Sequence, residues 1–386
     1  MYVHVQDLAL CHTWTWKLLT DGEDHPIPQV TTGFKEEITV QLPQNATPHD
    51  FLSLYLSDNI VDLIVCETDR YADQHIQRNV IPPHSPVRTW IPTTRDEMFS
   101  FLGLALLMGL IYKPRLHMYW SGDEILRTPV FGQVMSRDRF LLILRFLHFN
   151  DNDLYDAKDP QRDRLHKIRP IVDMIKVNCS SVLSPGPDLC VDESLVLFKG
   201  RVAFKQFVRT KRARFGLKMF ELCTSRGILL DFLVYHGKMR EELESIPGHN
   251  VLFSEQVPIT LMSRYLDKGH RLFLDNYYMS PVLTQYLLDR QTKAVGTMRP
   301  TRRNFPRELA NLSIAKGECK FMASHTGLLA VKYRALQDKS NKMPKIVHLL
   351  TTDHTNCCVN TGKKTKTANL SSNLTASPIT LTTWGA

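Results

Sequence analysis

The eight cysteines of this 386-residue chain include no Cys-x-x-Cys arrangement. They stand at positions 11, 66, 179, 190, 223, 319, 357 and 358. Zinc-finger motifs depend on such closely spaced pairs, so the sequence excludes the usual zinc-finger spacing. Scattered cysteines predict reduced, mostly buried thiols in an intracellular protein. The first residues show no signal-peptide pattern, which agrees with that prediction.

Long apolar runs are also missing. The most apolar stretch is residues 98–111, which is shorter than the roughly 20 residues that a helix needs to span a bilayer. We therefore predict a buried helix here and no membrane partner.

Acidic residues are absent between residues 199 and 218, where eight Lys or Arg residues occur. With a net charge of +9, this clustering favours a nucleic-acid partner. The predicted phosphate contacts are Lys199, Arg201, Lys205, Arg209, Lys211, Arg212, Arg214 and Lys218. A second basic segment adds Arg299, Arg302 and Arg303 as predicted DNA contacts.

The length predicts two or three domains, and 43% hydrophobic with 23% charged residues is typical of a globular protein. The chain divides by pattern into a flexible lead (1–48), a helical Arg-rich region (49–187), a strand-rich core (188–297), a β-rich segment (298–355) and a disordered tail (356–386). The helical region is either a DNA-binding domain or a scaffold with solvated arginines.

Helix signals are clear in the second region. Thr94 with Glu97 forms a capping-box signature for a helix that reaches about Tyr112. Ser136 begins a second helix, with a predicted buried stripe at Phe140, Leu141, Leu144 and Leu147. A third helix is expected over residues 168–183.

Three apolar runs, residues 189–198, 217–223 and 228–235, predict consecutive strands in a meander. The first strand carries Asp192. A crossover helix over residues 258–268, with Gly269 as stop signal, then leads to the short strand 272–274 and Asp275. Such a crossover normally gives a parallel strand pair, which would bring both aspartates to one point.

Two neighbouring carboxylates repel each other unless a cation lies between them. Mg²⁺ prefers one or two carboxylates together with water and phosphate oxygens, and it assists phosphoryl transfer. Asp192 and Asp275 are therefore candidate catalytic and metal-binding residues. The alternative is that both are solvated residues at strand ends.

The segment after Asp275 continues the alternation of helix and strand. Ser280 and Pro281 predict a helix start, and the helix should reach about Arg290. A strand follows at residues 293–298. Further strands are expected at residues 327–333 and 346–352.

Several motifs together resemble the piggyBac transposase family. They are ETDRYA (67–72), VFGQVMSRDRFLLILRFLHFNDND (130–153), VDESLVLFKGR (191–201), KRARFGLKMFELC (211–223), LDNYYMSPVLTQYLL (274–288), AVGTMRPTRRNFP (294–306) and KIVHLLTT (345–352). They occur in family order at similar spacing, and the resemblance covers about residues 50–365.

The resemblance implies an α/β fold with an RNase H-like core at 188–297, a helical N-terminal DNA-binding and dimerisation domain, and a β-rich insertion. It implies cut-and-paste transposition of double-stranded DNA at TTAA sites, assisted by Mg²⁺, in the nucleus, by a possible homodimer. Asp192 and Asp275 match the first and second catalytic aspartates. Asn276, Tyr277 and Ser280 match the flanking pattern and are expected to support the strand end.

The sequence departs from the family after Thr361-Gly-Lys-Lys364. No Asp or Glu follows Asp353, so the third catalytic aspartate and the Cys-rich zinc domain have no counterpart. His348, His354 and the adjacent Cys357 and Cys358 are a poor zinc site. We expect weak or absent Mg²⁺ binding and no catalysis. A frameshift after about Lys366 would account for the tail.

Three functions follow from these patterns. The first is a transposase-derived DNA-binding protein with an incomplete nuclease site. The second is an active transposase completed by another acid or another chain. The third is a protein-interaction scaffold that keeps the fold without binding DNA.

Overall fold

A computed structural model of the chain describes residues 14–20, 23–30, 36–209, 214–237, 239, 242–335, 345–356 and the backbone of 360–364 and 370–372. The chain forms two compact units. The helical unit is Thr39–Val182, and the sheet unit combines Met1–Ile38 with Leu183–Ala386.

The helical unit contains six α-helices and three short 3₁₀ helices among its described residues. They are α1 (Pro48–Ser53), α2 (Asp58–Arg78), η1 (Pro86–Thr89), α3 (Arg95–Leu110), η2 (Leu116–Trp120), α4 (Pro129–Val134), α5 (Arg137–Phe146), η3 (Asn152–Leu154) and α6 (Arg169–Val182).

Two predicted helix starts are confirmed by their caps. The Thr94 hydroxyl accepts a hydrogen bond from the Glu97 amide at 3.2 Å. The Ser136 hydroxyl accepts one from the Arg139 amide at 3.3 Å. Each bond satisfies an amide that would otherwise lack a partner at the helix N-terminus.

The buried faces of α3 and α5 differ from the predictions. Leu141 and Leu144 of α5 are exposed, and the buried residues are Phe140, Leu142, Ile143 and Phe146. The prediction was confirmed for Phe140 and wrong for Leu141 and Leu144, because Phe140 packs on Phe101 and Phe146 packs on Trp90, which turns that side inward. Helix α3 is only half buried, since Leu106 and Leu110 are 63% and 85% exposed.

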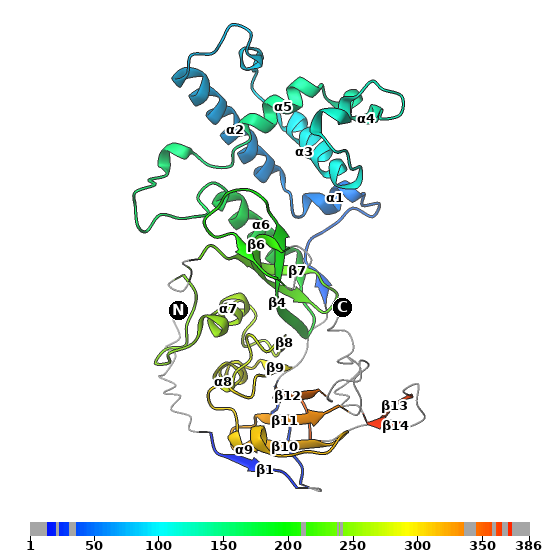
Figure 1. The fold of residues 1–386 in the computed structure, drawn as a ribbon, viewed down its shortest axis with the longest axis vertical. Coiled ribbons are helices and arrows are strands. Elements are labelled where there is room, and N and C mark those ends of the chain that lie inside the picture. The colour runs from blue at the N-terminus through cyan, green and yellow to red at the C-terminus, as the bar shows by residue number, and fades with distance from the viewer. Residues whose placement is uncertain are drawn as a thin grey trace. The chain divides into compact units, whose positions relative to one another are not determined.

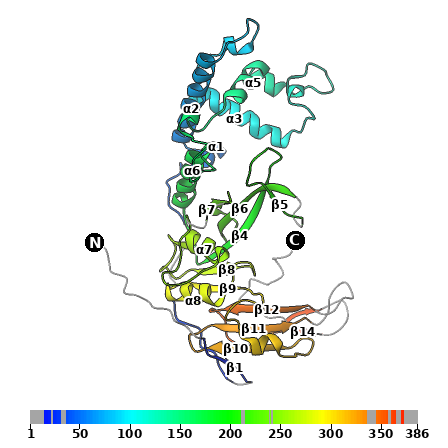
Figure 2. The ribbon, with the colours of Figure 1, turned by 60° about the vertical axis from the view of Figure 1, so that its left-hand side comes forward.

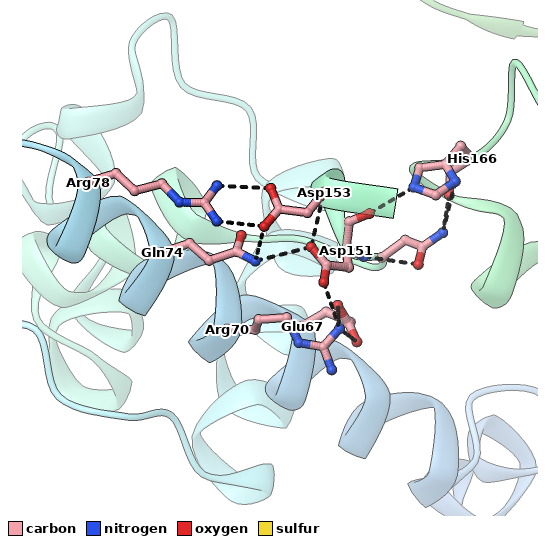
Figure 3. A network of polar contacts seen from close by, with 8 residues as sticks. Glu67, Arg70, Gln74, Arg78, Asp151, Asp153 and His166 are labelled. Carbon is pink, nitrogen blue, oxygen red and sulfur yellow. Dashed lines mark hydrogen bonds and ion pairs between the residues drawn. The ribbon is translucent and has the colours of Figure 1, made fainter. Parts of the chain in front are cut away.

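A polar network joins α2 to the segment around η3 (Figure 3). Arg78 binds the Asp153 carboxylate through both terminal nitrogens, and Gln74 donates to Asp151 at 3.1 Å and to Asp153 at 3.2 Å. Arg70 pairs with Glu67 and lies 3.7 Å from Asp151. The motifs at 67–72 and 130–153 therefore contact each other inside this unit.

The sheet unit is built on one ten-stranded sheet with the order β1-β10-β11-β12-β9-β8-β4-β6-β5, with β7 also paired to β6. Figure 1 shows β12, β11 and β10 side by side, continuing from β9. The strands are β1 (Trp16–Leu18), β4 (Asp188–Leu197), β5 (Gln206–Phe207), β6 (Phe215–Thr224), β7 (Leu229–Val234), β8 (Arg271–Leu274), β9 (Lys293–Thr297), β10 (Cys319–Ser324), β11 (Leu329–Arg334) and β12 (Ile346–Thr351).

The predicted meander and the predicted parallel pair are confirmed. Strand β4 lies between β6, which runs antiparallel to it, and β8, which runs parallel to it. Strand β7 then pairs antiparallel with β6, and β9 pairs parallel with β8. Residues 298–355 contribute α9 (Arg307–Asn311) and β10–β12, and these strands lie in the same sheet as β9.

The crossover helix is α7 (Phe253–Met262), not 258–268. It starts earlier because the Glu255 carboxylate accepts the Leu252 amide at 2.7 Å and caps the N-terminus. Pro258 therefore lies inside the helix rather than at its start. Gly269 has φ +85° before β8, where the chain turns into the strand.

Helix α8 (Pro281–Asp289) begins as predicted, with the Ser280 hydroxyl accepting the Leu283 amide at 3.1 Å. Helices α7 and α8 contribute Val257, Leu261, Leu283 and Leu287 to a fully buried core with the sheet. Because Val191 and Leu274 belong to that core, β4 and β8 present their alternate residues, among them Cys190 and Phe273, to the opposite face.

Three smaller features complete the fold. Strands β2 (Glu37–Ile38) and β3 (Leu183–Ser184) form a two-stranded ladder. Strands β13 (Asn360–Lys364) and β14 (Leu370–Ser372) form another, within the tail where the composition predicts disorder. No helix among the described residues is long and apolar enough to cross a membrane.

Candidate functional site

Asp192 and Asp275 follow the last residue pair of the parallel ladder between β4 and β8. That pair is Val191 with Leu274, so the two aspartates are the next residues on neighbouring chains. Adjacent strands lie about 4.8 Å apart. The register therefore brings together the two carboxylates that the sequence singled out.

The backbone after β8 holds the Asp275 carboxylate in place. One oxygen accepts the Tyr277 amide at 2.7 Å, and the Asp275 carbonyl accepts the amides of Tyr278 and Met279. Burial raises the pKa of Asp275, the Tyr277 and Tyr278 backbone bonds oppose this rise, and the nearby Glu193 adds to it. A half-buried carboxylate with a raised pKa is ready to gain from a bound cation.

The charges of both aspartates also affect the pKa values of two neighbouring groups, Cys190 and Tyr278. Burial first, and then the charges of Asp192, Cys223 and Asp275, raise the pKa of Cys190 to about 12. Burial, Glu193, Asp192 and Asp275 raise the pKa of Tyr278 as well. Cys190 and Tyr278 therefore lie near enough to both aspartates to be affected by their charges.

A carboxylate that the sequence analysis did not select lies beside Asp192. Glu221 of β6 is the direct cross-strand partner of Asp192, and the Ser194 hydroxyl donates a hydrogen bond to it. Asp192 itself accepts the Glu193 amide at 2.8 Å. Glu221 lies 29 positions from Asp192 in the chain. Only the antiparallel register of β4 and β6 shows that the two residues are neighbours.

Two of the predicted DNA contacts bind the turn that carries Asp275. Arg299 donates to the Asn276 side chain at 3.0 Å, and Arg302 donates to the Tyr277 carbonyl. Ser280 caps α8 directly after this turn. Arg299 and Arg302 thus tie the following segment to the strand end, whereas Arg303 is exposed.

The cationic arm, residues 199–218, includes β5 and the start of β6. Lys199, Arg201, Arg209 and Arg214 are exposed. Lys205 donates to the Gly200 carbonyl at 2.9 Å. None of these five cations pairs with a carboxylate in the part of the chain that the structure describes. Lys211 and Arg212 lie outside the described residues.

Lys218 differs from the rest of the arm. Its ammonium group lies 4.7 Å from the centre of the Phe220 ring and 5.0 Å from the centre of the Tyr277 ring. Both contacts are cation–π interactions. Lys218 therefore packs beside the turn after Asp275 instead of extending into solvent with the exposed arginines.

A second charged cluster stabilises the opposite end of the parallel strands. Arg271 bridges Asp188 at 2.7 Å and Asp353 at 2.6 Å, and Lys293 also binds Asp353 at 2.7 Å. Burial alone would raise the pKa of Asp353, but hydrogen bonds from Lys293 and Arg271 outweigh it and hold the pKa below its usual range.

Among the described side chains, no group of three His, Cys, Asp or Glu residues has metal-binding geometry. His354 shares a hydrogen bond with Thr351 at 2.7 Å, and Cys357 and Cys358 lie outside the described residues. Asp192 and Asp275 fit the partial coordination that Mg²⁺ accepts when phosphate oxygens and water complete its shell.

Both the sequence and the fold of this chain match known proteins. The family model described as Transposase IS4 matches residues 47–375. The chain belongs to the piggyBac-type transposase family. It is 29% identical over 264 residues to PiggyBac transposable element-derived protein 2 of Homo sapiens, covering 67% of this chain and 41% of that protein.

PiggyBac transposable element-derived protein 3 of Homo sapiens is 28% identical over 253 residues, which cover 66% of this chain and 40% of that protein. The matched part spans about two-fifths of the length of these relatives. A cryo-EM structure of the piggyBac transposase synaptic complex with hairpin DNA matches with a TM-score of 0.65 at 23% identity, covering 81% of this chain and 61% of that one. The RNase H-like fold predicted for the piggyBac-type chain is confirmed.

Proposed function

We propose that this chain is a transposase-derived protein that binds double-stranded DNA with the arm at 199–218 and presents Asp192 and Asp275 to the bound phosphates. The observation that carries this proposal is the arm itself, whose exposed cations lack carboxylate partners among the described residues. Exposed cations clustered on one segment attract a polyanion. The family suggests transposon ends and TTAA targets as the DNA, the nucleus as the location and a homodimer as the assembly.

Asp192 and Asp275 are the residues that would hold Mg²⁺. When bound, the ion would neutralise charge that develops on phosphate oxygens during strand cleavage or joining. The turn residues position Asp275, with the Tyr277 amide fixing one carboxylate oxygen. Arg299 and Arg302 hold the segment that follows.

We further propose that residues 1–386 alone do not cut DNA. The resemblance to the family implies three catalytic acids, and within residues 1–386 it assigns this role to Asp192 and Asp275. A two-ion mechanism needs ligands that fix both ions at a set distance. Two carboxylates would leave the second ion without a fixed position.

DNA binding is tested by measuring the affinity for a blunt DNA duplex at several salt concentrations. Replacing Lys199, Arg209 and Arg214 with Gln should lower the affinity for every duplex sequence. It should also reduce the slope of log affinity against log salt by up to about 3, because each lost phosphate contact removes about 0.9 from the slope.

The matched control replaces three exposed lysines outside the arm, Lys268, Lys316 and Lys345, with Gln. It removes the same charge and should leave the slope unchanged. Equal effects of the two triple variants would show that net charge alone acts. An unchanged slope in the arm variant would favour the protein-interaction scaffold instead.

A further inference from the structure

Two aromatic rings are exposed together at the end of the arm. Phe207 of β5 and Phe215 of β6 are direct cross-strand partners, and their ring centroids lie 4.7 Å apart. They are 57% and 51% exposed. A phenylalanine pair normally gains stability by burial, so an exposed pair marks a surface that another molecule can cover.

The backbone fixes this pair firmly. Gly216 follows Phe215 in β6, and a Cβ atom at Gly216 would collide with the carbonyl oxygen of Val196 in β4. The close approach places β6 between β4 and β5 at this point. Figure 2 shows β5 beside the end of β6, away from β8 and β9. The two rings are thus carried by a paired three-stranded segment.

Among the described residues, two positive charges lie next to the rings in the chain. Arg209 and Arg214 flank the pair, the Val208 amide donates to the Arg214 carbonyl at 2.8 Å, and both arginines are exposed. The nearest acidic residue after Phe215 in the sequence is Glu221. An apolar protein partner gains little from such charges, whereas a nucleic-acid strand gains from both the cations and the rings.

The ring pair and the acidic site share one face of the sheet. Residues 215, 217, 219 and 221 of β6 point to the same side because side chains alternate along a strand. Glu221 of that series is the direct partner of Asp192. Glu221 lies six positions after Phe215, which corresponds to roughly 20 Å along β6 at about 3.3 Å per residue.

We propose that Phe207 and Phe215 form a stacking platform for unpaired bases of a DNA strand whose phosphates reach the Asp192 and Asp275 site. The proposal rests on the proposed DNA-binding function and adds the class of DNA that this surface recognises. Every base has a π-face that can stack on phenylalanine, so the platform is independent of base sequence. The cations beside it bind the phosphates of the same strand.

The test compares a blunt duplex with the same duplex carrying an unpaired thymine tail. The wild-type protein should bind the tailed DNA more tightly. The double variant Phe207→Leu and Phe215→Leu should lose about ten-fold in affinity for the tailed DNA, equivalent to about 1.4 kcal/mol, which agrees with base–aromatic stacking. Its affinity for the blunt duplex should not change.

Matched variants separate stacking from general apolar contact. Tyrosine at both positions keeps the π-faces and should preserve the preference for tailed DNA. Leu197→Ala removes an exposed apolar side chain from the opposite face of β4 and should have no effect. In a Phe207→Trp variant, tailed DNA should change the indole fluorescence beyond the change seen in the wild-type protein.

Equal wild-type affinity for blunt and tailed DNA would overturn the proposal while leaving duplex binding intact. Equal losses in the leucine and tyrosine variants would also overturn it. Failure of the wild-type protein to bind either DNA would refute the proposed function together with this inference.

Discussion

Glu221 on β6 lies directly opposite Asp192 on β4. Like charges in a direct cross-strand pair destabilise a sheet. The Ser194 hydroxyl partly compensates by donating a hydrogen bond to Glu221. Repulsion at this acidic strand end thus lowers the stability of the fold. Such a loss of stability is common at functional sites.

Glu221→Gln should therefore stabilise the protein by about 0.5 kcal/mol in metal-free, low-salt buffer, because it removes the repulsion and keeps an oxygen for Ser194. The measurement is urea unfolding, and the gain should shrink as salt is added. Glu318→Gln is the control, since Glu318 pairs with Lys320 at 3.0 Å and its loss should not stabilise. A destabilised Glu221→Gln protein would contradict the repulsion.

Asp353→Asn should destabilise the protein by about 3 kcal/mol at neutral pH, because Arg271 and Lys293 would lose the carboxylate between them. The pKa of Asp353 is lowered in the folded protein. Its contribution is therefore present above the unfolded pKa of about 3.9 and lost as the pH falls through the folded pKa.

The difference between wild type and Asp353→Asn, measured by thermal unfolding from neutral to acidic pH, should begin to shrink near pH 4 and be lost as the pH falls below the folded pKa. Asp267→Asn is the control, because the pair of Asp267 with Arg290 is largely exposed and contributes little. A pH-independent difference would show that the charge of Asp353 is not what stabilises the fold.

Asp151→Ala should destabilise the helical unit by about 1–2 kcal/mol, because the Asp153 amide and Gln74 would both lose an acceptor. Asp156→Ala is a matched control. Asp156 accepts the Lys158 amide at 2.8 Å in a similar turn, and it is exposed. Equal losses in thermal unfolding would show that the network in Figure 3 adds nothing beyond its local turns.

Purified residues 1–386 should leave supercoiled plasmid DNA intact in the presence of Mg²⁺ or Mn²⁺, because two carboxylates do not fix two ions. The readout is conversion to nicked circles on a gel. Asp192→Asn provides the control for contaminating nucleases. Cation-dependent nicking that disappears in this variant would show that the chain is an active nuclease.

The sequence by itself determined where three helices begin and how the two central parallel strands pair. The hydroxyl caps at Thr94, Ser136 and Ser280 depend on residues three positions apart, and all three helices begin there. The pairing of the Asp192 and Asp275 strands followed from the order of strand, crossover and strand, because chain geometry permits few ways to connect parallel strands.

Tertiary structure decided the rest. Which side of α5 is buried depended on Phe101 and Trp90, residues of other segments. The partnership of Glu221 with Asp192 and the bridge from Arg271 to Asp353 join residues 29 and 82 positions apart. No periodicity encodes such contacts, because strand register and long-range packing are set only when the whole sheet forms.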